Sequence, residues 1–401
     1  VSRVRPMYAV MQGAVDKVNR IIQENLTAVR VVKAYVRGNH EIEKFEGVNQ
    51  NLKNNSERAF RTAVLNMPAM QFVMYGTILA ILWFGGNMAM AGEMEVGELT
   101  GFLSYVLQVL NSLMMLSNVF LMLTRGLASW RRIREVLDEE IDITEEQAKE
   151  IEVQKGEIEF RDVSFKFQKN AAENVLEHIS FHILPGQTFG IIGQTGSAKS
   201  TLVQLIPRLY DVTEGQVLVD GHPVQEYPLK GLRDSIAMVL QKNTLFSGTV
   251  EENLRWGKED ATREEIDTAC RIACVDEFID RLENGYQTEM GQGGVNVSGG
   301  QKQRLCIARA ILKRPKVLIL DDSTSAVDTA TEAKIREGLE KELPGMTKII
   351  IAQRVSSVAH ADQILILDDG KLNDIGTHQE LLERNQIYQD IYYSQQEGAN
   401  L

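Results

Sequence analysis

A segment of small residues, 193–201, reads Gly-Gln-Thr-Gly-Ser-Ala-Lys-Ser-Thr and follows a short β-rich run, residues 188–192. The residues after it, 202–209, have a helical pattern. A strand, a loop of small residues and a helix, in this order, form a phosphate-binding loop, or P-loop. Its small residues let successive backbone N–H groups face phosphates, and the helix N-terminus adds partial positive charge. We therefore predict that this segment binds the phosphates of a nucleotide.

Neighbouring side chains in this loop have separate predicted roles. Lys199 would reach the terminal phosphates, and Ser200 would be a ligand of Mg²⁺. Glycine usually precedes the lysine, but Ala198 stands there. A methyl group so close to phosphate would weaken binding, although alanine is the least disruptive replacement for glycine. The predicted nucleotide-binding residues of the loop are Gly193, Thr195, Gly196, Ser197, Ala198, Lys199, Ser200 and Thr201.

A second chemical group follows an apolar run, residues 316–320, which ends in Asp321. A carboxylate at the end of a buried strand holds the Mg²⁺ shell in P-loop enzymes, but a strand followed by aspartate is common. Asp321 becomes significant because the segment Val-Ser-Gly-Gly-Gln, residues 297–301, lies just before this strand. There Ser298 offers a hydroxyl, and two glycines permit exposed N–H donors at a helix start.

These segments together resemble the ATPases of ABC transporters, over essentially the whole chain. Residues 297–301 are similar to the family's signature motif, usually Leu-Ser-Gly-Gly-Gln, and Gln241 resembles the glutamine of its Q-loop. Residues 325–328 resemble the D-loop, and Phe167 occupies the place of an adenine-stacking aromatic residue, usually tyrosine. Five motifs in the family's order make chance agreement negligible.

The resemblance implies ATP and Mg²⁺ as cofactors, and an ABC-type α/β P-loop NTPase domain joined to an all-α transmembrane part. It also implies that two such domains close head to tail, with each ATP between the P-loop of one and the signature of the other. The resemblance assigns catalysis to Asp322, Gln353 and Gln241, Mg²⁺ binding to Ser200, Gln241 and Asp321, and nucleotide binding to Phe167, Ser298, Gly299, Gly300, Gln301 and the P-loop residues above.

Several departures from the family's pattern fall on the chemistry. The family places a water-polarising glutamate where Asp322 stands, and a misplacement of roughly 1 Å can reduce a rate on the order of 10²-fold. Its switch histidine is replaced by Gln353, which can hydrogen-bond the γ-phosphate but cannot take a charge. Gln292 stands near the signature, where glutamate is common. We therefore expect a site that binds ATP and hydrolyses it slowly.

The intact signature, residues 298–301, points to one half of a heterodimeric exporter. In this interpretation the chain's P-loop forms the degenerate site, and its signature completes the competent site of a second half-transporter that keeps the catalytic glutamate and the switch histidine. Alternatives are a homodimeric exporter with atypical catalytic residues, a normal or engineered enzyme with these substitutions, and a regulatory membrane protein that uses ATP binding as a switch.

Two uncharged apolar runs, about 62–92 and 99–124, are each longer than the roughly 20 residues that span a bilayer. The loop between them is acidic, whereas the outer flanks carry arginines, so the positive-inside rule places both flanks in the cytoplasm. We expect a multi-pass protein of the plasma membrane with a cytoplasmic ATP-binding domain and a small, amphipathic export substrate. The alternative is a pair of buried helices in a soluble core.

An apolar N-terminal third and a charged remainder divide the 401 residues. We expect the C-terminal part of an exporter's transmembrane domain at 1–138, an acidic linker at 139–154 and the ATP-binding domain at 155–401. The net charge of −12 argues against nucleic-acid binding. We interpret the three cysteines as reduced packing residues. The chain begins without methionine, so we expect a fragment of a longer polypeptide that lacks four preceding membrane helices.

Overall fold

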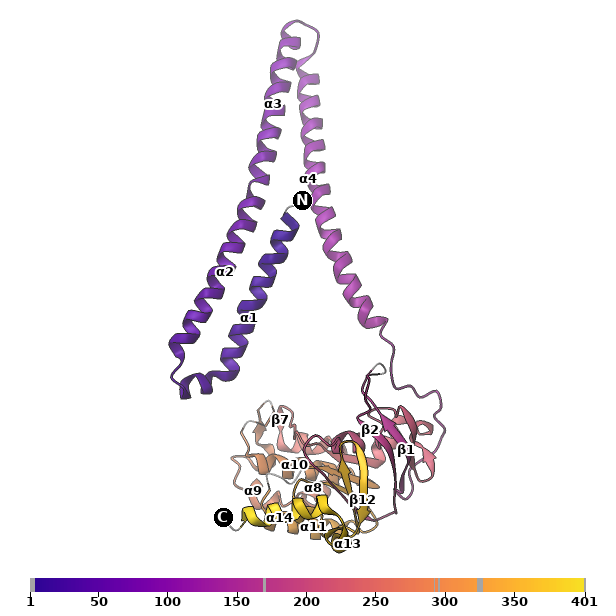
Figure 1. Ribbon diagram of the computed structural model, residues 1–401. Coiled ribbons are helices and arrows are strands. Elements are labelled where there is room, and N and C mark those ends of the chain that lie inside the picture. The colour runs from indigo at the N-terminus through magenta and orange to yellow at the C-terminus, as the bar shows by residue number, and fades with distance from the viewer. Residues whose placement is uncertain (1–3, 169–170, 292, 295, 323–326, 400–401) are drawn as a thin grey trace. The chain divides into compact units, whose positions relative to one another are not determined.

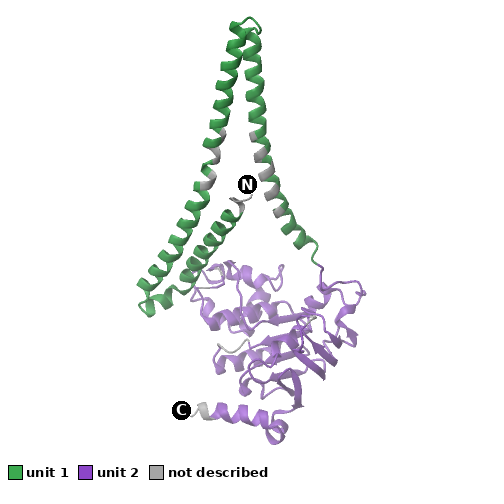
Figure 2. Ribbon diagram, turned by 45° about the horizontal axis from the view of Figure 1, so that its top comes forward, with its two compact units in different colours: residues 1–139 green, residues 140–401 purple. Residues whose placement is uncertain are grey.

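The computed structural model describes residues 4–168, 171–291, 293–294, 296–322 and 327–399. Side chains are not described at 4–5, 62–63, 66–67, 70, 114, 117–118, 120–121, 124–125, 128 and 397–399. The chain divides into two compact units, residues 1–139 and residues 140–401 (Figure 2).

The first unit is helical, and its helices form two antiparallel pairs, α1 with α2 and α3 with α4 (Figure 1). Leu65 separates α2 from α3, and Pro68 lies just inside α3. Because proline has no N–H to donate to the carbonyl of Val64, the hydrogen-bond ladder is interrupted at this point. The helices are α1 (Val4–Ala34), α2 (Gly38–Val64), α3 (Asn66–Met90) and α4 (Val96–Leu137).

The turn between α1 and α2 exposes apolar side chains. Tyr35 is 75% exposed and Val36 is 88% exposed. Val36 also has a φ of 53°, in the left-handed region that β-branched residues avoid. The tip of this hairpin therefore presents an aromatic and a β-branched side chain to its surroundings.

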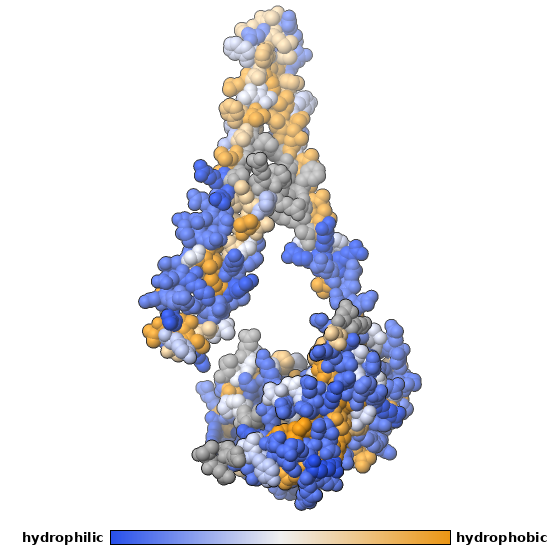
Figure 3. All heavy atoms as spheres, in the orientation of Figure 1, coloured by the Kyte–Doolittle hydropathy of each residue, from blue (hydrophilic) through white to orange (hydrophobic). Residues whose placement is uncertain are grey.

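Apolar side chains also cover the outside of α3, where Phe72 is 81% exposed and Trp83 is 70% exposed (Figure 3). Within the described residues, one helical segment, Gln71–Met90, is long and apolar enough to cross a membrane. Its 20 residues extend over about 30 Å, the thickness of a bilayer's hydrocarbon core. The expected second span, 99–124, lies within α4, and several of its side chains are outside the described set.

The second unit contains a six-stranded sheet in the order β12-β11-β3-β10-β9-β6. All neighbours are parallel except β11 and β12. Ile351 of β10 pairs with Ile191 of β3 and with Asp321 of β9, so these three strands end at one level. The strands are β3 (Thr188–Ile192), β6 (Ile236–Val239), β9 (Val317–Asp321), β10 (Thr347–Ile351), β11 (Gln363–Asp368) and β12 (Lys371–Gly376).

An antiparallel sheet in the order β2-β1-β4-β5 packs against the first one. The rings of Phe160, Phe181 and Phe189 stack in a row, with centroids 4.5 and 5.4 Å apart, and Phe189 belongs to β3 of the parallel sheet. These apolar contacts fix the two sheets against each other. The strands are β1 (Ile158–Phe165), β2 (Leu176–Ile183), β4 (Glu214–Val219) and β5 (His222–Pro223), and α5 (Lys199–Gln204) follows β3.

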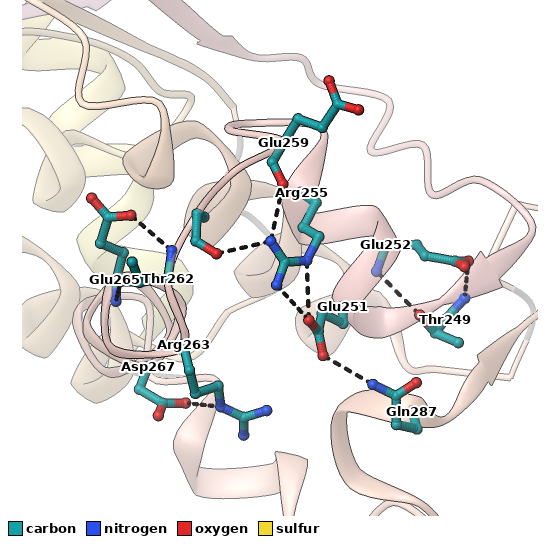
Figure 4. Close-up of polar contacts among 11 residues, drawn as sticks. Thr249, Glu251, Glu252, Arg255, Glu259, Thr262, Arg263, Glu265, Asp267 and Gln287 are labelled. Carbon is teal, nitrogen blue, oxygen red and sulfur yellow. Dashed lines mark hydrogen bonds and ion pairs between the residues drawn. The ribbon is translucent and has the colours of Figure 1, made fainter.

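Helices beyond β6 surround the long buried face of α10 (Gly299–Leu312). Arg255 holds this region together, because its guanidinium donates to the Glu251 carboxylate and to the carbonyls of Glu259 and Ala261 at 2.7–3.0 Å (Figure 4). The elements here are β7 (Gly248–Thr249), α7 (Val250–Arg255), α8 (Arg263–Ile272), α9 (Asp276–Ile279), the 3₁₀ turn Gly285–Gln287 and β8 (Glu289–Met290). The 3₁₀ turn Val224–Glu226 and α6 (Leu229–Ser235) come before β6 and pack in the core shared by the two sheets.

Four helices complete the unit: α11 (Thr329–Glu342), α12 (Val355–Val358), α13 (His378–Arg384) and α14 (Gln386–Ala399). Tyr388 anchors α14, since it is fully buried and its hydroxyl lies 2.7 Å from Nδ1 of His378. Tyr388 packs in the same apolar cluster as Ile192, Ala352 and Val355. The C-terminal helix thus shares its core with the ends of β3 and β10.

Residues 140–154 belong to the second unit and contact it by polar groups. Asp220 accepts hydrogen bonds from the backbone N–H groups of Gln154 and Lys155, at 2.6 and 2.9 Å. Lys149 forms an ion pair with Glu226. Much of the segment expected to be a linker therefore lies against the domain that follows it. The three cysteines are buried and form no disulfide.

Replacing Tyr388 by alanine should lower the free energy of unfolding of the second unit by about 3 kcal/mol or more, because the change leaves a cavity in a packed core. In a thermal melt of the purified protein this corresponds to a drop of at least about 6 °C. Tyr393→Ala on the same helix is the matched control, since that side chain is 54% exposed and its loss should change stability by less than about 0.5 kcal/mol. Equal effects of the two changes would contradict the assigned anchor.

Candidate functional site

Four chain segments meet at the carboxyl edge of the parallel sheet. The loop of residues 193–198 follows β3, Asp321 and Asp322 lie at the end of β9, Gln353 follows β10, and Gln241 follows β6. Because β3, β10, β9 and β6 are neighbours in this order, residues more than 150 positions apart in sequence are brought to one edge. Ligands of parallel sheets bind at this edge.

The P-loop adopts backbone angles that restrict its residues. Gly196 has a φ of 89°. A Cβ on Gly193 would lie 2.0 Å from the carbonyl oxygen of Leu367, so only glycine fits there. Ala198 is the N-cap of α5 and has a φ of 69° and a ψ of 21°, in the left-handed region. Thr195 and Gly196 are exposed, Ser197 is buried, and Thr201 lies half-buried in α5.

Lys199 places its charge inside this loop. Its ammonium donates to the carbonyls of Gly193 and Gln194, at 2.8 and 2.7 Å, and contacts the Ser197 hydroxyl at 3.2 Å. Partial burial lowers the pKa of Lys199, and the nearby aspartates oppose this shift. The lysine thus supplies a localised positive charge where the loop surrounds an anion.

Ser200 and Asp321 form a pair of oxygen ligands next to the loop. The Ser200 hydroxyl donates to Oδ1 of Asp321 at 3.0 Å. Burial raises the pKa of Asp321, and the neighbouring Asp322 charge adds to this effect. A hydroxyl and a carboxylate are the hard oxygen ligands that Mg²⁺ prefers, so these two residues fit the ion that the sequence predicts.

Asp322 lies at the centre of a cluster of side-chain amides. Its Oδ2 accepts a hydrogen bond from Nε2 of Gln353 at 2.8 Å and a longer one from Nε2 of Gln241 at 3.4 Å. Burial raises the pKa of Asp322, while the two amides and the charges of Lys199 and Arg354 oppose the shift. Its φ is 46°, a conformation in which aspartate occurs more readily than most residues. The three predicted catalytic residues are therefore in direct contact.

The signature segment forms the start of α10. Ser298 is the N-cap, its hydroxyl accepts from the N–H of Gln301, and the Gln301 side chain accepts from the N–H of Ser298. This reciprocal cap leaves the N–H groups of Gly299 and Gly300 at an exposed or half-exposed helix end, where anions are favoured. Between the described residues of this segment and those of the P-loop, no hydrogen bond or ion pair is present.

Gln292 and the first residues of the D-loop, 325–326, lie outside the described residues. The D-loop aspartate, Asp328, is described and caps α11: its carboxylate accepts hydrogen bonds from the N–H and hydroxyl of Thr331, at 3.0 and 2.7 Å. Its local role in the described structure is to start this helix.

Phe167 lies two residues after the end of β1 and is exposed, as an aromatic platform for a base must be. Its ring meets Phe165 and Tyr210 edge-to-face, with centroids 5.0 and 5.3 Å apart. Sequence reasoning missed Tyr210, which follows α5 by only a few residues. The sequence signal that could have indicated Tyr210 is an aromatic residue shortly after the P-loop helix.

Comparison with known proteins identifies the architecture. The ABC transporter family matches residues 176–325, and the ABC transporter transmembrane region matches residues 1–113. An uncharacterized ABC transporter ATP-binding protein of Bacillus subtilis (strain 168) is 43% identical over 97% of this chain and 67% of its own length. A probable multidrug resistance ABC transporter ATP-binding/permease protein of the same strain is 36% identical, over 98% and 67%.

An ATP-dependent lipid A-core flippase of Desulfotalea psychrophila (strain LSv54 / DSM 12343) is 34% identical over 98% of this chain and 68% of its own length. The structure of a bacterial Atm1-family ABC exporter with ATP bound superposes with a TM-score of 0.85 at 28% identity, covering 98% of this chain and 70% of that one. The chain thus spans about two thirds of the length of these relatives.

The predicted fold class, a helical transmembrane part joined to an ABC-type α/β domain, is confirmed by these matches. The chain belongs to the ABC transporter family: it is an exporter chain with fused transmembrane and ATP-binding domains, whose ATPase is coupled to transport across a membrane.

Proposed function

We propose that this chain is one subunit of a heterodimeric exporter in the plasma membrane, and that its own P-loop forms a degenerate ATP site. Its signature then completes the competent site of a partner half-transporter that carries the catalytic glutamate and the switch histidine. ABC exporters act as dimers, and both predicted ATP sites would be shared between the two chains. The domain boundaries at 138 and 154 and the multi-pass topology are part of this proposal.

The contact of Asp322 with two glutamines carries the proposal. The acid that would polarise water is an aspartate, one methylene shorter than the family's glutamate, and its Oδ2 is oriented by hydrogen bonds from both amides. Gln353 cannot change its charge during the reaction, unlike a histidine. Together, the shorter acid and the non-titrating switch residue support slow hydrolysis at this chain's own P-loop.

In this proposal different residues of the site bind ATP and catalyse its hydrolysis. Phe167 stacks against the base, the P-loop N–H groups and Lys199 hold the phosphates, and Ser200, Asp321 and Gln241 would hold Mg²⁺, which supplies charge neutralisation of the phosphates. Asp322 and Gln353 would orient water and the γ-phosphate less effectively than glutamate and histidine do. The signature of this chain contributes its hydroxyl and N–H donors to the other ATP.

The substrate class is proposed from the relatives. One of them is described as a probable multidrug resistance transporter and another as a lipid A-core flippase. A lipid is amphipathic, and small, amphipathic molecules, as expected from the sequence, are the class that we propose. A homodimeric exporter with atypical catalytic residues is the alternative within the family, and the family matches do not separate it from the heterodimer. A purely regulatory membrane protein would lack ATP-driven transport in vesicles.

Exchanging Ala198 for glycine should stabilise the P-loop. The left-handed conformation is unfavourable by about 1–2 kcal/mol for a residue with a Cβ, and glycine's extra unfolded-state freedom offsets about 0.4–1 kcal/mol of the gain. The net stabilisation is at most about 1.6 kcal/mol, so the melting temperature should rise by up to about 6 °C, without weaker ATP binding. As a control, Ala333→Gly in the middle of α11 should lower it, because glycine weakens a helix. If both variants had a lower melting temperature, the claim that Ala198 has a strained backbone would be wrong.

Restoring both chemical groups, by Asp322→Glu together with Gln353→His, should raise ATP hydrolysis at this chain's P-loop by up to roughly 10²-fold. The longer acid regains reach, and the imidazole regains a titratable group. The measurement is single-turnover hydrolysis in a complex whose other ATP site has been disabled. Unchanged turnover would place the defect elsewhere, with Ala198 the next residue to test.

Changes in the signature and in the P-loop should have unequal effects on the whole complex. Ser298→Arg would place charge and volume against the partner-bound γ-phosphate and remove a donor to the transferring group, so turnover should nearly vanish. Lys199→Ala removes a phosphate contact only at the slow site, so it should weaken nucleotide retention while substantial hydrolysis remains. ATPase assays of the purified two-subunit complex compare them. Equal loss of activity would favour the homodimer.

A further inference from the structure

Gln395, on the C-terminal helix α14, touches the switch loop at two backbone positions. Its Oε1 accepts a hydrogen bond from the N–H of Val355 at 2.9 Å, and its Nε2 donates to the carbonyl of Gln353 at 2.7 Å. We propose that Gln395 is a positioning residue for ATP hydrolysis, which holds the switch loop so that the Gln353 side chain stays on Asp322. This inference rests on the catalytic roles proposed above for Gln353 and Asp322.

The local chain does not provide this support itself. Val355 begins α12, and the first N–H groups of a helix have no partner within the helix. Arg354, the N-cap residue, makes no side-chain cap hydrogen bond. Gln395 takes over the role of a cap from a helix 40 residues further along the chain. With its second hydrogen bond it spans the loop and connects the end of β10 to the start of α12.

Gln395 influences the catalytic site through a single residue, Gln353. The backbone carbonyl of Gln353 is bound by Gln395, and the Nε2 of the same residue donates to Oδ2 of Asp322 at 2.8 Å. A shift of the Gln353 backbone therefore moves its amide relative to the carboxylate. Because rates depend on the placement of reacting groups within about 1 Å, a loosened loop should reduce the chemical step more than ATP binding.

The helix that carries Gln395 is held firmly enough for this task. Tyr388 is fully buried at the start of α14, and Ile391 and Tyr392 pack against the cluster that contains Ala352 and Val355. Gln395 lies one turn further along the same helix and is only half-exposed. The C-terminal helix and the switch loop thus share an apolar core and are joined above it by two polar contacts.

The test compares Gln395→Leu, which removes both hydrogen bonds, with Gln395→Glu, which keeps an acceptor for Val355 but cannot donate to Gln353. Gln396→Leu is the matched control, because that neighbouring glutamine is exposed and its hydrogen bond to Tyr392 stays within α14. Gln353→Leu reports on the catalytic role itself. Each variant is made in the full-length transporter in lipid nanodiscs with the other ATP site disabled, and kcat for ATP hydrolysis, apparent KM for ATP and melting temperature are measured.

We expect Gln395→Leu to lower kcat about tenfold, less than the roughly 10²-fold that a fully misplaced group produces, and to leave KM within about twofold. The kcat of Gln395→Glu should lie between those of wild type and Gln395→Leu, and the kcat of Gln396→Leu should equal that of wild type.

If Gln353→Leu hydrolyses ATP slowly but Gln395→Leu has the same kcat as the control, the positioning role is wrong and the proposed function stands. A joint fall of kcat, ATP affinity and melting temperature would reduce Gln395 to a structural residue. If neither Gln353→Leu nor Gln395→Leu changes hydrolysis, both the positioning role and the catalytic role of Gln353 are wrong.

Discussion

The parallel pairing of β10 between β3 and β9 is the constraint on which the ATP site depends. These strands are buried on both faces, and Ile349 at the centre of β10 is completely inaccessible. Since side chains alternate along a strand, a shift of the register by one residue would turn this apolar set away from its core. The same register places the end of β3, where the P-loop begins, level with Asp321. Apolar packing therefore sets the distance between lysine and carboxylate.

That arrangement places like charges close together at the edge of an apolar core. Asp321 and Asp322 both have pKa values raised chiefly by burial, and each of them is near the ammonium of Lys199, whose pKa is lowered by burial. Each charged group is thus less stable than it would be in water. Oxygen and nitrogen groups held this way interact strongly with a phosphate and a divalent cation, because little water has to be displaced or reoriented. The stability of the fold and the affinity of the site therefore oppose each other at these three residues.

Much of this site was predictable because its signals are local. The P-loop is one continuous segment, Asp321 ends a recognisable apolar run, and Ser298 stands three residues before Gln301 as a capping pair does. The helix expected to extend over 202–209 ends at Gln204 instead, and Pro207 and the left-handed Arg208 that follow cannot continue it. The contact between Asp322 and its two glutamines was not predictable, because it depends on the order of three strands. The same holds for Tyr210 and Gln395, whose partners are distant in sequence.

The exposed tip of the α1–α2 hairpin affects the lifetime of this protein in a cell. Tyr35 and Val36 are largely exposed at the end of a long helical pair, and exposed apolar side chains favour association with other apolar surfaces. A newly made chain whose tip stays uncovered is a target for chaperones and proteases, and it also tends to aggregate. The rate at which a covering surface is supplied therefore helps to set how many copies of this chain persist, independently of any effect on ATP.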